Sequence, residues 1–435
     1  MEPAVSRART GGMESLYRRE GITGCVCTAE FLGSPRRHSP DTWTMAYCTR
    51  FMADATTPVS CIHDADCGAC ALLGTGYTAQ LGQKREILVE AIRKQSRLRG
   101  VKPLPCLPSP LVDSYRNRAK MAVGISPKET RLGYFRTGTR EIVDAPECRV
   151  LVPELLETTG RIRRFLQRSR NIPPALRYVD LRCGSDPTRQ HVTLVFRDTA
   201  LPPFPLDLLR RACPAVTGIS ANLNPESDGQ VIRGAIRPLW GEREVWVDHA
   251  NLKFRVSPAA FFQVNLRILP VIHTLMARFF ERGDVLADLY AGVGTHGLAL
   301  RRRFRRVLFA EGSRSAVADL KSTVRAHRIE GVAIVPVAVE RGLTRLRDET
   351  PDAVVLNPSR AGAHPAVLDA VSRCPVTKLA YLSCDPTTLC RDLHHLRRAG
   401  FEIRSVQPID MMPQTRQVEA LALLTRSAGR RRARS

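Results

Sequence analysis

A glycine-rich turn between a buried strand and a helix constrains this chain more than any other feature. Residues 286–297 read Leu-Ala-Asp-Leu-Tyr-Ala-Gly-Val-Gly-Thr-His-Gly, and Gly292, Gly294 and Gly297 have G-x-G-x-x-G spacing. Glycine lets the backbone turn sharply and lets a ligand come close at the carboxyl end of a strand. The spacing therefore predicts a nucleotide-binding turn in an open parallel sheet. A plain strand–helix turn is the simpler alternative.

From about residue 265 onward, short apolar segments alternate with segments of helical periodicity. The expected strands cover residues 285–290, 306–311, 333–337, 353–357 and 378–383. This alternation predicts a parallel sheet covered by helices on both faces. The earlier part of the chain instead combines helical patterns at 77–95 and 151–168 with several short strand patterns. The predicted fold class is α/β, with a C-terminal Rossmann-like domain and an N-terminal and central α+β region that is mostly β.

A large excess of basic residues indicates a polyanionic partner. The chain has 435 residues, and 66 Lys and Arg against 42 Asp and Glu give a formal net charge of +24. Residues 1–60 hold seven basic and six acidic residues, so the excess belongs to the rest of the chain. Nucleic acid is the commonest partner of such a surface, because binding to phosphates releases counterions. A bias toward GC-rich codons is the alternative, since 58 of the basic residues are arginine.

Apolar patterning and cysteine usage indicate the compartment in which the protein works. No apolar run approaches the ~18 residues of a membrane span, which rules out an integral membrane protein. The N-terminus lacks the basic-then-apolar pattern of a signal peptide. We therefore expect a cytoplasmic protein of two or three domains. In a reducing compartment, clustering among the 13 cysteines indicates metal binding or catalysis rather than disulfides.

The spacing of the glycine-rich turn suits NAD as well as S-adenosylmethionine. Glu311 ends the next expected strand, where its carboxylate could accept hydrogen bonds from ribose hydroxyls of either ligand. Two features favour S-adenosylmethionine. Asp288 lies just before the turn, in an Asp-Leu-Tyr-x-Gly-x-Gly pattern that resembles class I methyltransferases. The turn also lies in the C-terminal part of the chain, whereas a dinucleotide domain usually opens a longer doubly wound sheet.

Other polar and reactive residues also lie at strand ends. Cys384 follows the strand at 378–383, Asn357 and Arg360 follow another strand, and Glu419 precedes a third. The carboxyl ends of parallel strands share one edge of a sheet, so Cys384 could face the same crevice as the glycine-rich turn. Taken alone, each residue has a simpler interpretation: a buried inert cysteine or a solvated glutamate.

Together these segments resemble the RNA uracil-C5 methyltransferase family, which makes 5-methyluridine. The resemblance covers roughly residues 61–425 and recurs in chain order. Besides the glycine-rich turn, the matching stretches are Tyr115-Arg116-Asn117-Arg118-Ala119-Lys120, Arg131-Leu132-Gly133-Tyr134-Phe135, Phe261-Phe262-Gln263-Val264-Asn265, Ser383-Cys384-Asp385-Pro386-Thr387-Thr388 and Pro413-Gln414-Thr415-Arg416-Gln417-Val418-Glu419. The turn alone is moderately specific, whereas the combination is a strong signal. It implies a C-terminal class I methyltransferase domain, S-adenosylmethionine as methyl donor and RNA as partner.

The chemistry of uracil methylation explains why these residue types are needed. Uracil C5 becomes nucleophilic only after a thiolate adds to C6, and a base must then remove the C5 proton. By resemblance, Cys384 is the nucleophile and Glu419 the proton acceptor. The residues that match the family's donor-binding positions are Gln263, Tyr290, Thr295, Glu311 and Asn357. The target uridine should be flipped out of its stack or already unpaired, because the base must be reachable.

The chain departs from the family at Asn357-Pro358-Ser359-Arg360, where Asp-Pro-Pro-Arg is usual. Asparagine keeps an acceptor oxygen but loses the charge, and some members of the shorter ribosomal-RNA group also have it. Three alternatives to a ribosomal-RNA enzyme stay open: a transfer-RNA uracil-C5 methyltransferase, a non-catalytic iron–sulfur RNA-binding protein, and an NAD-dependent oxidoreductase. The presence of both Cys384 and Glu419 argues against the non-catalytic alternative.

Four cysteines form a second candidate site. Cys61, Cys67 and Cys70 are closely spaced, and Cys148 follows after a long interval. Four thiolates suit either tetrahedral zinc or an iron–sulfur cluster, and buried unligated cysteines are the simpler alternative. The spacing resembles the [4Fe–4S] site of the ribosomal-RNA members of the family, which favours 23S ribosomal RNA as substrate. The role would be structural or RNA-contacting, because the methylation mechanism needs no electrons.

The expected domain organisation has four parts: 1–60, 61–262, 263–425 and 426–435. The first is interpreted as a disordered extension, or as sequence upstream of the true start, and the last as a basic tail. The part at 61–262 would hold the cluster and bind RNA, and the part at 263–425 would catalyse the methyl transfer. The first segment lacks the strand pattern of the family's N-terminal β-barrel, so the chain resembles the short form, and we expect a monomer. We expect His296 and the eight remaining cysteines to pack rather than react.

Overall fold

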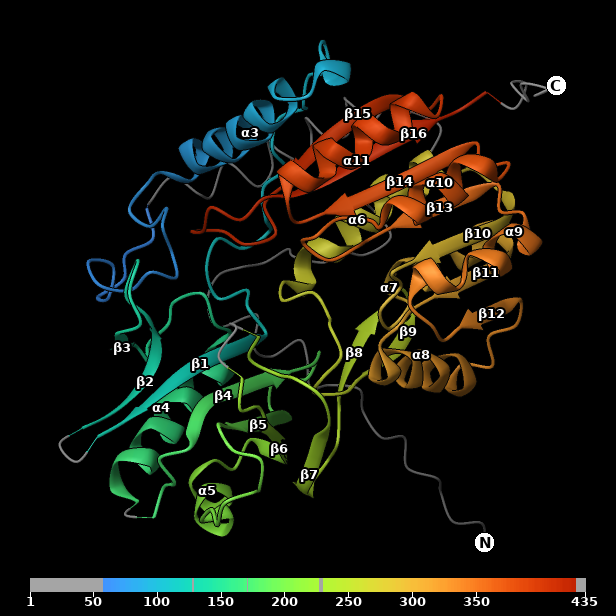
Figure 1. Cartoon of the computed structure of the whole chain (residues 1–435). Coiled ribbons are helices and arrows are strands. Elements are labelled where there is room, and N and C mark those ends of the chain that lie inside the picture. Colours follow the sequence, from blue (N-terminus) through green and yellow to red (C-terminus); the bar gives the residue numbers. More distant parts are fainter. Residues whose placement is uncertain (1–57, 127–128, 170, 227–229, 428–435) are drawn as a thin grey trace, which may run out of the picture. The chain divides into compact units, whose positions relative to one another are not determined.

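The computed structural model describes residues 58–126, 129–169, 171–226 and 230–427 (Figure 1). The expectations for the N-terminal extension and the basic tail fall almost entirely outside the described residues. Within them, strands gather into a C-terminal seven-stranded sheet, a central seven-stranded sheet and a two-stranded hairpin. No helix in these described ranges is long and apolar enough to cross a membrane.

The C-terminal sheet has the predicted parallel core and one reversed strand. Its strands are β10 (Gly283–Leu289), β11 (Phe304–Ala310), β12 (Val332–Val335), β13 (Ala353–Leu356), β14 (Lys378–Ser383), β15 (Glu402–Ile409) and β16 (Glu419–Thr425). Their order in the sheet is β12-β11-β10-β13-β14-β16-β15. The first five are parallel to one another, whereas β16 runs antiparallel to both β14 and β15. The reversal brings the start of β16 to the edge where β14 ends.

Helices cover both faces of this sheet, as the alternation predicts. They are α6 (Leu269–Phe279), α7 (Thr295–Leu300), α8 (Arg314–Ala326), α9 (Leu343–Glu349), α10 (Pro365–Arg373) and α11 (Pro386–Arg398). Leu308 of β11 belongs to a core cluster shared with α9, α10 and α11. The next residue, Phe309, points to the opposite face. Its ring lies close to Gly297 of α7 and to Gly294, and Leu320 of α8 also lies close to Gly294. Successive strand residues point to opposite faces, so this sheet is buried on both sides.

The first described helix, α3 (Tyr77–Arg93), packs with the C-terminal sheet (Figure 1). It contacts α11, and its buried Leu88 and Ile92 belong to the same core cluster as the helices of that layer. A short 3₁₀ turn, Ser96–Leu98, continues the contact with α11. The apolar residues expected on one side of the 77–95 helix therefore pack against helices from the C-terminal part of the chain.

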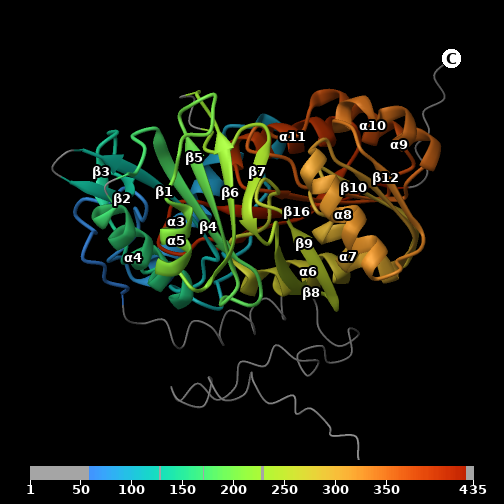
Figure 2. The same cartoon turned by 90° about the horizontal axis from the view of Figure 1, so that it is seen from below.

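The central sheet is mostly antiparallel (Figure 2). It contains β1 (Arg118–Ile125), β2 (Thr130–Phe135), β3 (Ile142–Asp144), β4 (Leu176–Cys183), β5 (Gln190–Phe196), β6 (Val216–Leu223) and β7 (Ile236–Gly241), in the order β3-β2-β1-β4-β5-β6-β7. Only the β5–β6 pair is parallel among its described pairs. Two helices, α4 (Pro153–Arg168) and α5 (Leu206–Ala212), lie together on one face and share its core.

A hairpin of β8 (Val245–His249) and β9 (Leu252–Val256) lies between the two sheets in sequence. It packs on α8 through β9. The fold class is thus confirmed: an α/β protein with a Rossmann-like C-terminal sheet and a mostly β central region. The residue boundaries of the four expected domains stay a prediction.

Candidate active site

The glycine-rich turn connects β10 to α7 and needs glycine for two different reasons. Gly292 and Gly294 have φ values of +58° and +82°, a region that residues with side chains rarely adopt. A Cβ on Gly297 would lie 2.5 Å from the ring of Phe309, so this glycine lets α7 pack closely on the sheet. A Cβ on Gly292 would meet nothing within 4 Å. The backbone at Gly292 therefore faces open space that a ligand can enter.

Asp288 stabilises the glycine-rich turn through a buried hydrogen bond. Its side chain is fully buried, and its Oδ2 accepts a 2.8 Å hydrogen bond from the backbone N–H of Gly297. Burial raises the pKa of Asp288 to about 8, the bond from Gly297 opposes this shift, and the charge of Glu311 adds to it. A carboxyl that is neutral at pH 7 can be buried here without an ion partner. Asp288 thus positions the start of α7 rather than contacting a ligand.

Glu311 lies at the carboxyl end of β11, beside the turn. Its Oε2 accepts a 2.8 Å bond from the N–H of Gly292, and its Oε1 accepts a 2.7 Å bond from the N–H of Ser313. Each carboxylate oxygen keeps a further lone pair. The half-buried side chain is therefore fixed next to the open side of Gly292, where ribose hydroxyls could reach it.

Two more of the expected donor-binding residues belong to the same turn. Tyr290 has φ +60°, unusual for a residue with a side chain, and its hydroxyl accepts a 3.0 Å bond from the N–H of His364. The bond ties the turn to the loop that follows β13. Thr295 is the first residue of α7 and is half-buried. Gln263 is buried in a segment that Asn117 holds through a 3.0 Å backbone bond to Val264.

Asn357 follows β13, and its backbone N–H donates to the carbonyl of Leu289 at the end of β10. Its side chain is bonded to a histidine that sequence reasoning assigned only to packing: Asn357 Nδ2 lies 3.1 Å from His296 Nε2. His296 Nδ1 lies 2.9 Å from His273 Nε2, and His273 Nδ1 lies 2.5 Å from His249 Nε2. His296 is buried as expected, and it also connects Asn357 to a chain of histidines.

Burial keeps these three histidines neutral at pH 7. It lowers the pKa of His296 and of His249 to about 4, and it lowers the pKa of His273 well below the ordinary value. Neighbouring imidazoles add to the shifts of His273 and His296. A neutral imidazole has one donor and one acceptor nitrogen, so the chain has a direction. With the amide nitrogen of Asn357 donating, each histidine donates through Nδ1 to the next one.

Cys384 lies at the junction of β14 and α11. Asp385 caps the helix: its Oδ1 accepts a 2.8 Å bond from the N–H of Thr388, and Pro386 occupies the first helical turn. These residues end the strand and start the helix within three positions, so the backbone turns sharply at Cys384. The thiol is half-buried rather than enclosed.

The reversed strand β16 brings Glu419 to Cys384. The last pair of the β14–β16 ladder is Ser383 with Ala420, so at the next position Cys384 lies opposite Glu419. Arg360, from the loop after β13, donates a 2.8 Å bond to Oε1 of Gln417, and its positive charge acts on both Cys384 and Glu419. Three segments that are far apart in sequence thus place a thiol, a carboxyl and a guanidinium together.

The electrostatics of this trio favour a protonated resting state. Burial raises the pKa of the Cys384 thiol, the Glu419 charge raises it further, and Arg360 lowers it. Burial raises the pKa of Glu419 to about 8, which Arg360 opposes. Glu419 is only 4% exposed. A buried carboxylate with a high pKa is a strong base once it is ionised.

The loop that leads into Glu419 is held by α3. Gln80 Oε1 accepts a 3.0 Å bond from the N–H of Gln414, and Gln80 Nε2 donates at 2.9 Å to Gln414 Oε1. Lys84 forms a fully buried ion pair with Asp410 and donates at 2.9 Å to the carbonyl of Met412. Gln414 has φ +69°. Sequence reasoning missed these α3 residues, because a Gln and a Lys on a helix read as solvent-facing.

The four candidate ligand cysteines line one cavity, together with Tyr134. Cys61, Cys67 and Cys70 come from a segment that bonds along β2 through the N–H of Gly68 and the carbonyl of Phe135, 3.1 Å apart. Burial raises the pKa of Cys70 to about 12, and the other three thiols raise it further. The thiols are therefore close enough to repel one another as thiolates. Cationic metal bound among them would offset that repulsion.

Among the described residues, no three or more His, Cys, Asp or Glu side chains are placed so that they could share a single metal ion. The cysteines outside the proposed sites that the structure describes are all buried, as expected: Cys106, Cys183, Cys213, Cys374 and Cys390. Cys25, Cys27 and Cys48 lie outside the described residues.

A parallel sheet with a reversed seventh strand, a glycine-rich turn with open space at Gly292 and an acidic residue after the second strand define a methyltransferase of the class that uses S-adenosylmethionine. Comparisons with known proteins agree. Residues 240–427 match the family model described as tRNA (Uracil-5-)-methyltransferase. An uncharacterized RNA methyltransferase of Thermosynechococcus vestitus is 31% identical over 85% of this chain and 84% of its own. One of Halalkalibacterium halodurans is 27% identical over 82% and 81%.

A solved structure extends the similarity to the fold. The tRNA (uracil-54, C5)-methyltransferase of Pyrococcus abyssi, in complex with S-adenosyl-L-homocysteine, has a TM-score of 0.64 and 25% sequence identity. It covers 80% of this chain and 83% of its own. The chain belongs to the RNA uracil-C5 methyltransferase family and is an RNA methyltransferase that depends on S-adenosylmethionine.

Proposed function

We propose that this enzyme converts uridine to 5-methyluridine in 23S ribosomal RNA through a covalent bond between Cys384 and uracil C6. The observation that carries the mechanism is the antiparallel pairing of β14 with β16, which sets Cys384 opposite the buried Glu419. The proposed nucleophile directly follows β14 and the proposed base begins the neighbouring strand β16. They do not depend on the closure of a mobile loop.

In the first step the Cys384 sulfur bonds to C6, and the electron pair of the C5–C6 double bond moves toward C5 and the O4 carbonyl. Arg360 supports this step, because its positive charge favours the thiolate over the thiol. S-adenosylmethionine, when bound, would supply an electrophilic methyl group: C5 bonds to the methyl carbon while the bond from that carbon to the sulfonium sulfur breaks, which leaves S-adenosylhomocysteine.

In the second step Glu419 takes the proton from C5. The electron pair of that C–H bond restores the C5–C6 double bond, and the bond between C6 and the Cys384 sulfur breaks. The thiolate is regenerated, and Glu419 is left protonated. A carboxylate whose pKa burial has raised to about 8 is better suited to remove this proton than an exposed one.

Five residues are proposed to hold the methyl donor: Gln263, Tyr290, Thr295, Glu311 and Asn357. Support comes from four of them, Tyr290, Thr295, Glu311 and Asn357, which follow the carboxyl ends of β10, β11 and β13. Glu311 is bonded to Gly292, and Asn357 to the backbone at the end of β10. Glu311 lies beside the open space at Gly292, so ribose hydroxyls of the donor would find acceptor oxygens there.

Cys61, Cys67, Cys70 and Cys148 are proposed to hold a [4Fe–4S] cluster. The donor set supports this, since four thiols line one cavity and a [4Fe–4S] cluster takes four cysteine ligands, whereas among the described residues no three of them are placed to share a single metal ion. Burial raises the pKa of Cys67, Cys70 and Cys148, so these three thiols would be costly to ionise without metal. A structural role has support as well: the N–H of Leu72, two residues after Cys70, donates at 3.0 Å to the carbonyl of Gln414. The cluster would thus stabilise the segment that braces the loop before Glu419.

Ribosomal RNA is proposed from the resemblance of the cysteine spacing to the iron–sulfur members of the family. Transfer RNA is the alternative, because the solved relative is named as an enzyme acting on tRNA uracil-54. Mapping 5-methyluridine in the RNA of a deletion strain decides between them. We expect one position in 23S RNA to lose its methyl group and transfer RNA to keep its own; the reverse result would overturn the ribosomal assignment.

The covalent mechanism is tested by trapping. With Glu419→Gln the sulfur adds and C5 is methylated, but the proton stays, so protein bound covalently to RNA should accumulate on a denaturing gel. Cys384→Ser should give no covalent species and no methyl transfer. Glu402→Gln, a change at an exposed position, should behave like wild type. Full methyl transfer by Cys384→Ser would overturn the mechanism, as would tritium release from 5-labelled uracil that neither variant reduces.

A further inference from the structure

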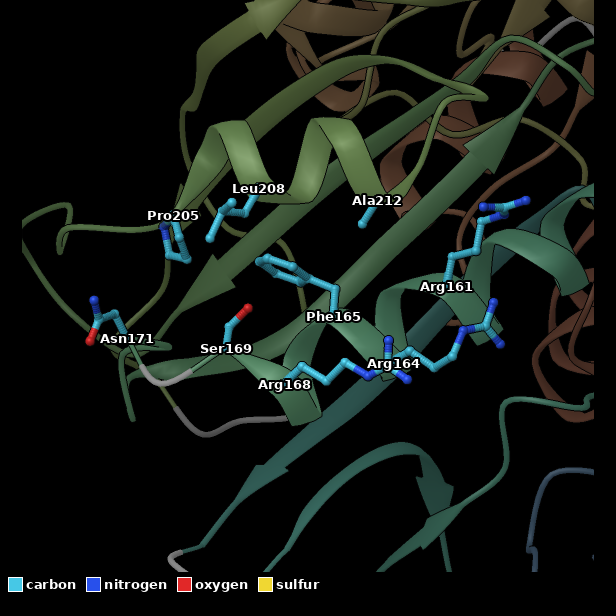
Figure 3. Close-up of a pocket in the computed structure, with 9 residues that line it drawn as sticks. All are labelled: Arg161, Arg164, Phe165, Arg168, Ser169, Asn171, Pro205, Leu208 and Ala212. Atoms are coloured by element: carbon cyan, nitrogen blue, oxygen red, sulfur yellow. The ribbon is translucent and has the colours of Figure 1, made fainter.

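A hollow between α4 and α5 lies apart from every residue placed in the active site or the cysteine cavity (Figure 3). Its volume is about 500 Å³, enough for a nucleotide-sized group. Figure 3 shows arginines along α4 on one side, residues of α5 and the turn before it on the other, and an aromatic ring between them. The residues that line it include Arg161, Arg164, Phe165, Arg168, Pro205 and Leu208.

The rim of the hollow is cationic. Arg161, Arg164 and Arg168 recur at helical spacing and so project from one side of α4. Arg161 is paired with Glu157, at 2.7 Å. Arg164 and Arg168 are exposed, and no ion pair of theirs is found within the described part of the chain. The backbone positions of these two arginines lie about one helical turn apart, roughly 6 Å along the axis, so their guanidinium groups can bind an anion with more than one charge.

The floor of the hollow is apolar. The Phe165 ring is buried and lies 5.9 Å from the ring of Phe204. Leu208 of α5 is 53% exposed, and Pro205 lies beside it. A small inorganic anion would leave this apolar surface in water. A ligand that carries a flat apolar face together with several negative charges would cover both the floor and the rim.

We propose that this hollow is a second RNA-binding site that holds an unpaired nucleotide of the substrate, with its base over Leu208 and Phe165 and its flanking phosphates on Arg164 and Arg168. RNA is the substrate class of the enzyme, and an unpaired strand offers both a free base face and successive phosphates. The inference rests on RNA as substrate and not on the Cys384 chemistry. Binding can therefore be measured without methyl transfer.

The first test compares two double variants of the full-length protein with the same change in net charge. The rim variant, Arg164→Gln with Arg168→Gln, removes two positive charges from the edge of the hollow. The control variant, Arg345→Gln with Arg347→Gln, removes two exposed arginines of α9. A fluorescein-labelled oligoadenylate is the probe, read by anisotropy over a series of salt concentrations. We expect the rim variant to bind roughly tenfold more weakly and its log–log salt slope to fall by about 1.4, the value for two lost phosphate contacts on a single strand.

The second test addresses the apolar floor. Leu208→Asp should weaken oligoadenylate binding, whereas Leu201→Asp, at a comparably exposed leucine outside the hollow, should not. Inorganic polyphosphate should compete poorly with oligoadenylate, because it has no base. In methyl-transfer assays the rim variant should raise the KM for RNA and leave kcat unchanged.

Three outcomes would overturn the proposal. Equal loss of affinity in both arginine pairs would indicate a general charge effect. Equal competition by polyphosphate and oligoadenylate would indicate a plain anion site. Unchanged affinity in the rim variant would show that RNA does not contact the hollow. A failure of the Cys384 mechanism would leave all three measurements unaffected, so the two proposals fail separately.

Discussion

The side-chain nitrogen of Asn357 lies 3.1 Å from Nε2 of His296, at one end of a hydrogen-bonded chain that continues through His273 to His249. The family usually has aspartate at this position. An ionised aspartate cannot donate to a neutral imidazole, whereas asparagine can. The exchange of Asp for Asn therefore fits the buried, neutral histidines beneath the turn. Asn357 is thus matched to the histidine that it contacts.

Asn357→Asp should destabilise the protein and change the titration of His296. The new carboxylate must either reverse every donor along the chain or draw a proton onto His296. We expect a loss of about 1–3 kcal/mol in the free energy of unfolding, measured by urea denaturation at pH 7. We also expect the pKa of His296 to rise from about 4, measured by NMR of labelled histidine. Asn251→Asp, at an exposed position, is the control. Unchanged values for both quantities would contradict the pairing.

The pH dependence of catalysis should report Glu419. Because burial raises the pKa of this carboxyl to about 8, most of the free enzyme holds it protonated at pH 7. We expect kcat/KM for RNA to fall by about tenfold or more for each pH unit below 8, because Glu419 and the Cys384 thiol, whose pKa burial also raises, must both lose a proton. Arg360→Gln should move this limb to higher pH, since Arg360 lowers the pKa of both Glu419 and Cys384. Arg404→Gln should leave the limb in place. A profile that is flat from pH 6 to 8 would contradict the assignment.

The same shift predicts a pH-dependent effect on stability. The folded pKa of Glu419 lies above the ordinary value of 4.5, so its contribution to stability is full below pH 4.5 and is lost as the pH rises through 8. Glu419→Gln removes this loss. The variant should match wild type near pH 4.5 and become more stable toward pH 9, by roughly 1.4 kcal/mol for each pKa unit of the shift. Denaturation at both pH values measures the difference; an equal difference at both would rule out the linkage.

Much of the fold could be predicted from local patterns. The strand expected at 378–383 is β14 with the same bounds, and the helix expected at 77–95 is α3. Buried parallel strands read as continuous apolar runs, and glycine at Gly292 and Gly294 marks a turn that other residues would strain. The apposition of Cys384 and Glu419 follows from strand reversal. The sequence shows each at a strand end, but their pairing rests on the register of β14 with β16.

The rest depends on contacts between distant segments, which leave no local pattern. Gln80 and Gln414 are 334 positions apart and form paired hydrogen bonds. His249 and His273 lie on different elements and come together only in the folded chain. Amphipathic periodicity reports which face of α3 is buried, and it does not report that a lysine on that face meets a buried aspartate. The contacts by which α3 holds the loop before Glu419 therefore could not be predicted from the sequence.

Lys84 gives a direct test of that bracing. Its ion pair with Asp410 is fully buried, so Lys84→Met leaves a buried carboxylate without its cationic partner. We expect a loss of about 3–5 kcal/mol in the free energy of unfolding. Lys84→Met combined with Asp410→Leu should recover much of this loss, because no unpaired charge remains. Lys94→Met, at the exposed end of α3, should cost little. A single variant as stable as wild type would show that the pair does not hold the loop.

The cysteine cavity can be tested by removing one thiol. If Cys67 ligates a [4Fe–4S] cluster, anaerobically purified Cys67→Ser should lose iron and sulfide together with the brown absorbance of the wild-type protein. Cys106→Ser, at a cysteine outside the cavity, should retain both. Because Leu72 joins the cysteine segment to Gln414, loss of the cluster should also lower kcat while S-adenosylmethionine still binds in calorimetry. Wild-type protein that is colourless and contains zinc but no iron would refute the cluster. If Cys67→Ser lacks iron but has an unchanged kcat, the assignment of the cluster stands, and its coupling to the Glu419 loop is refuted.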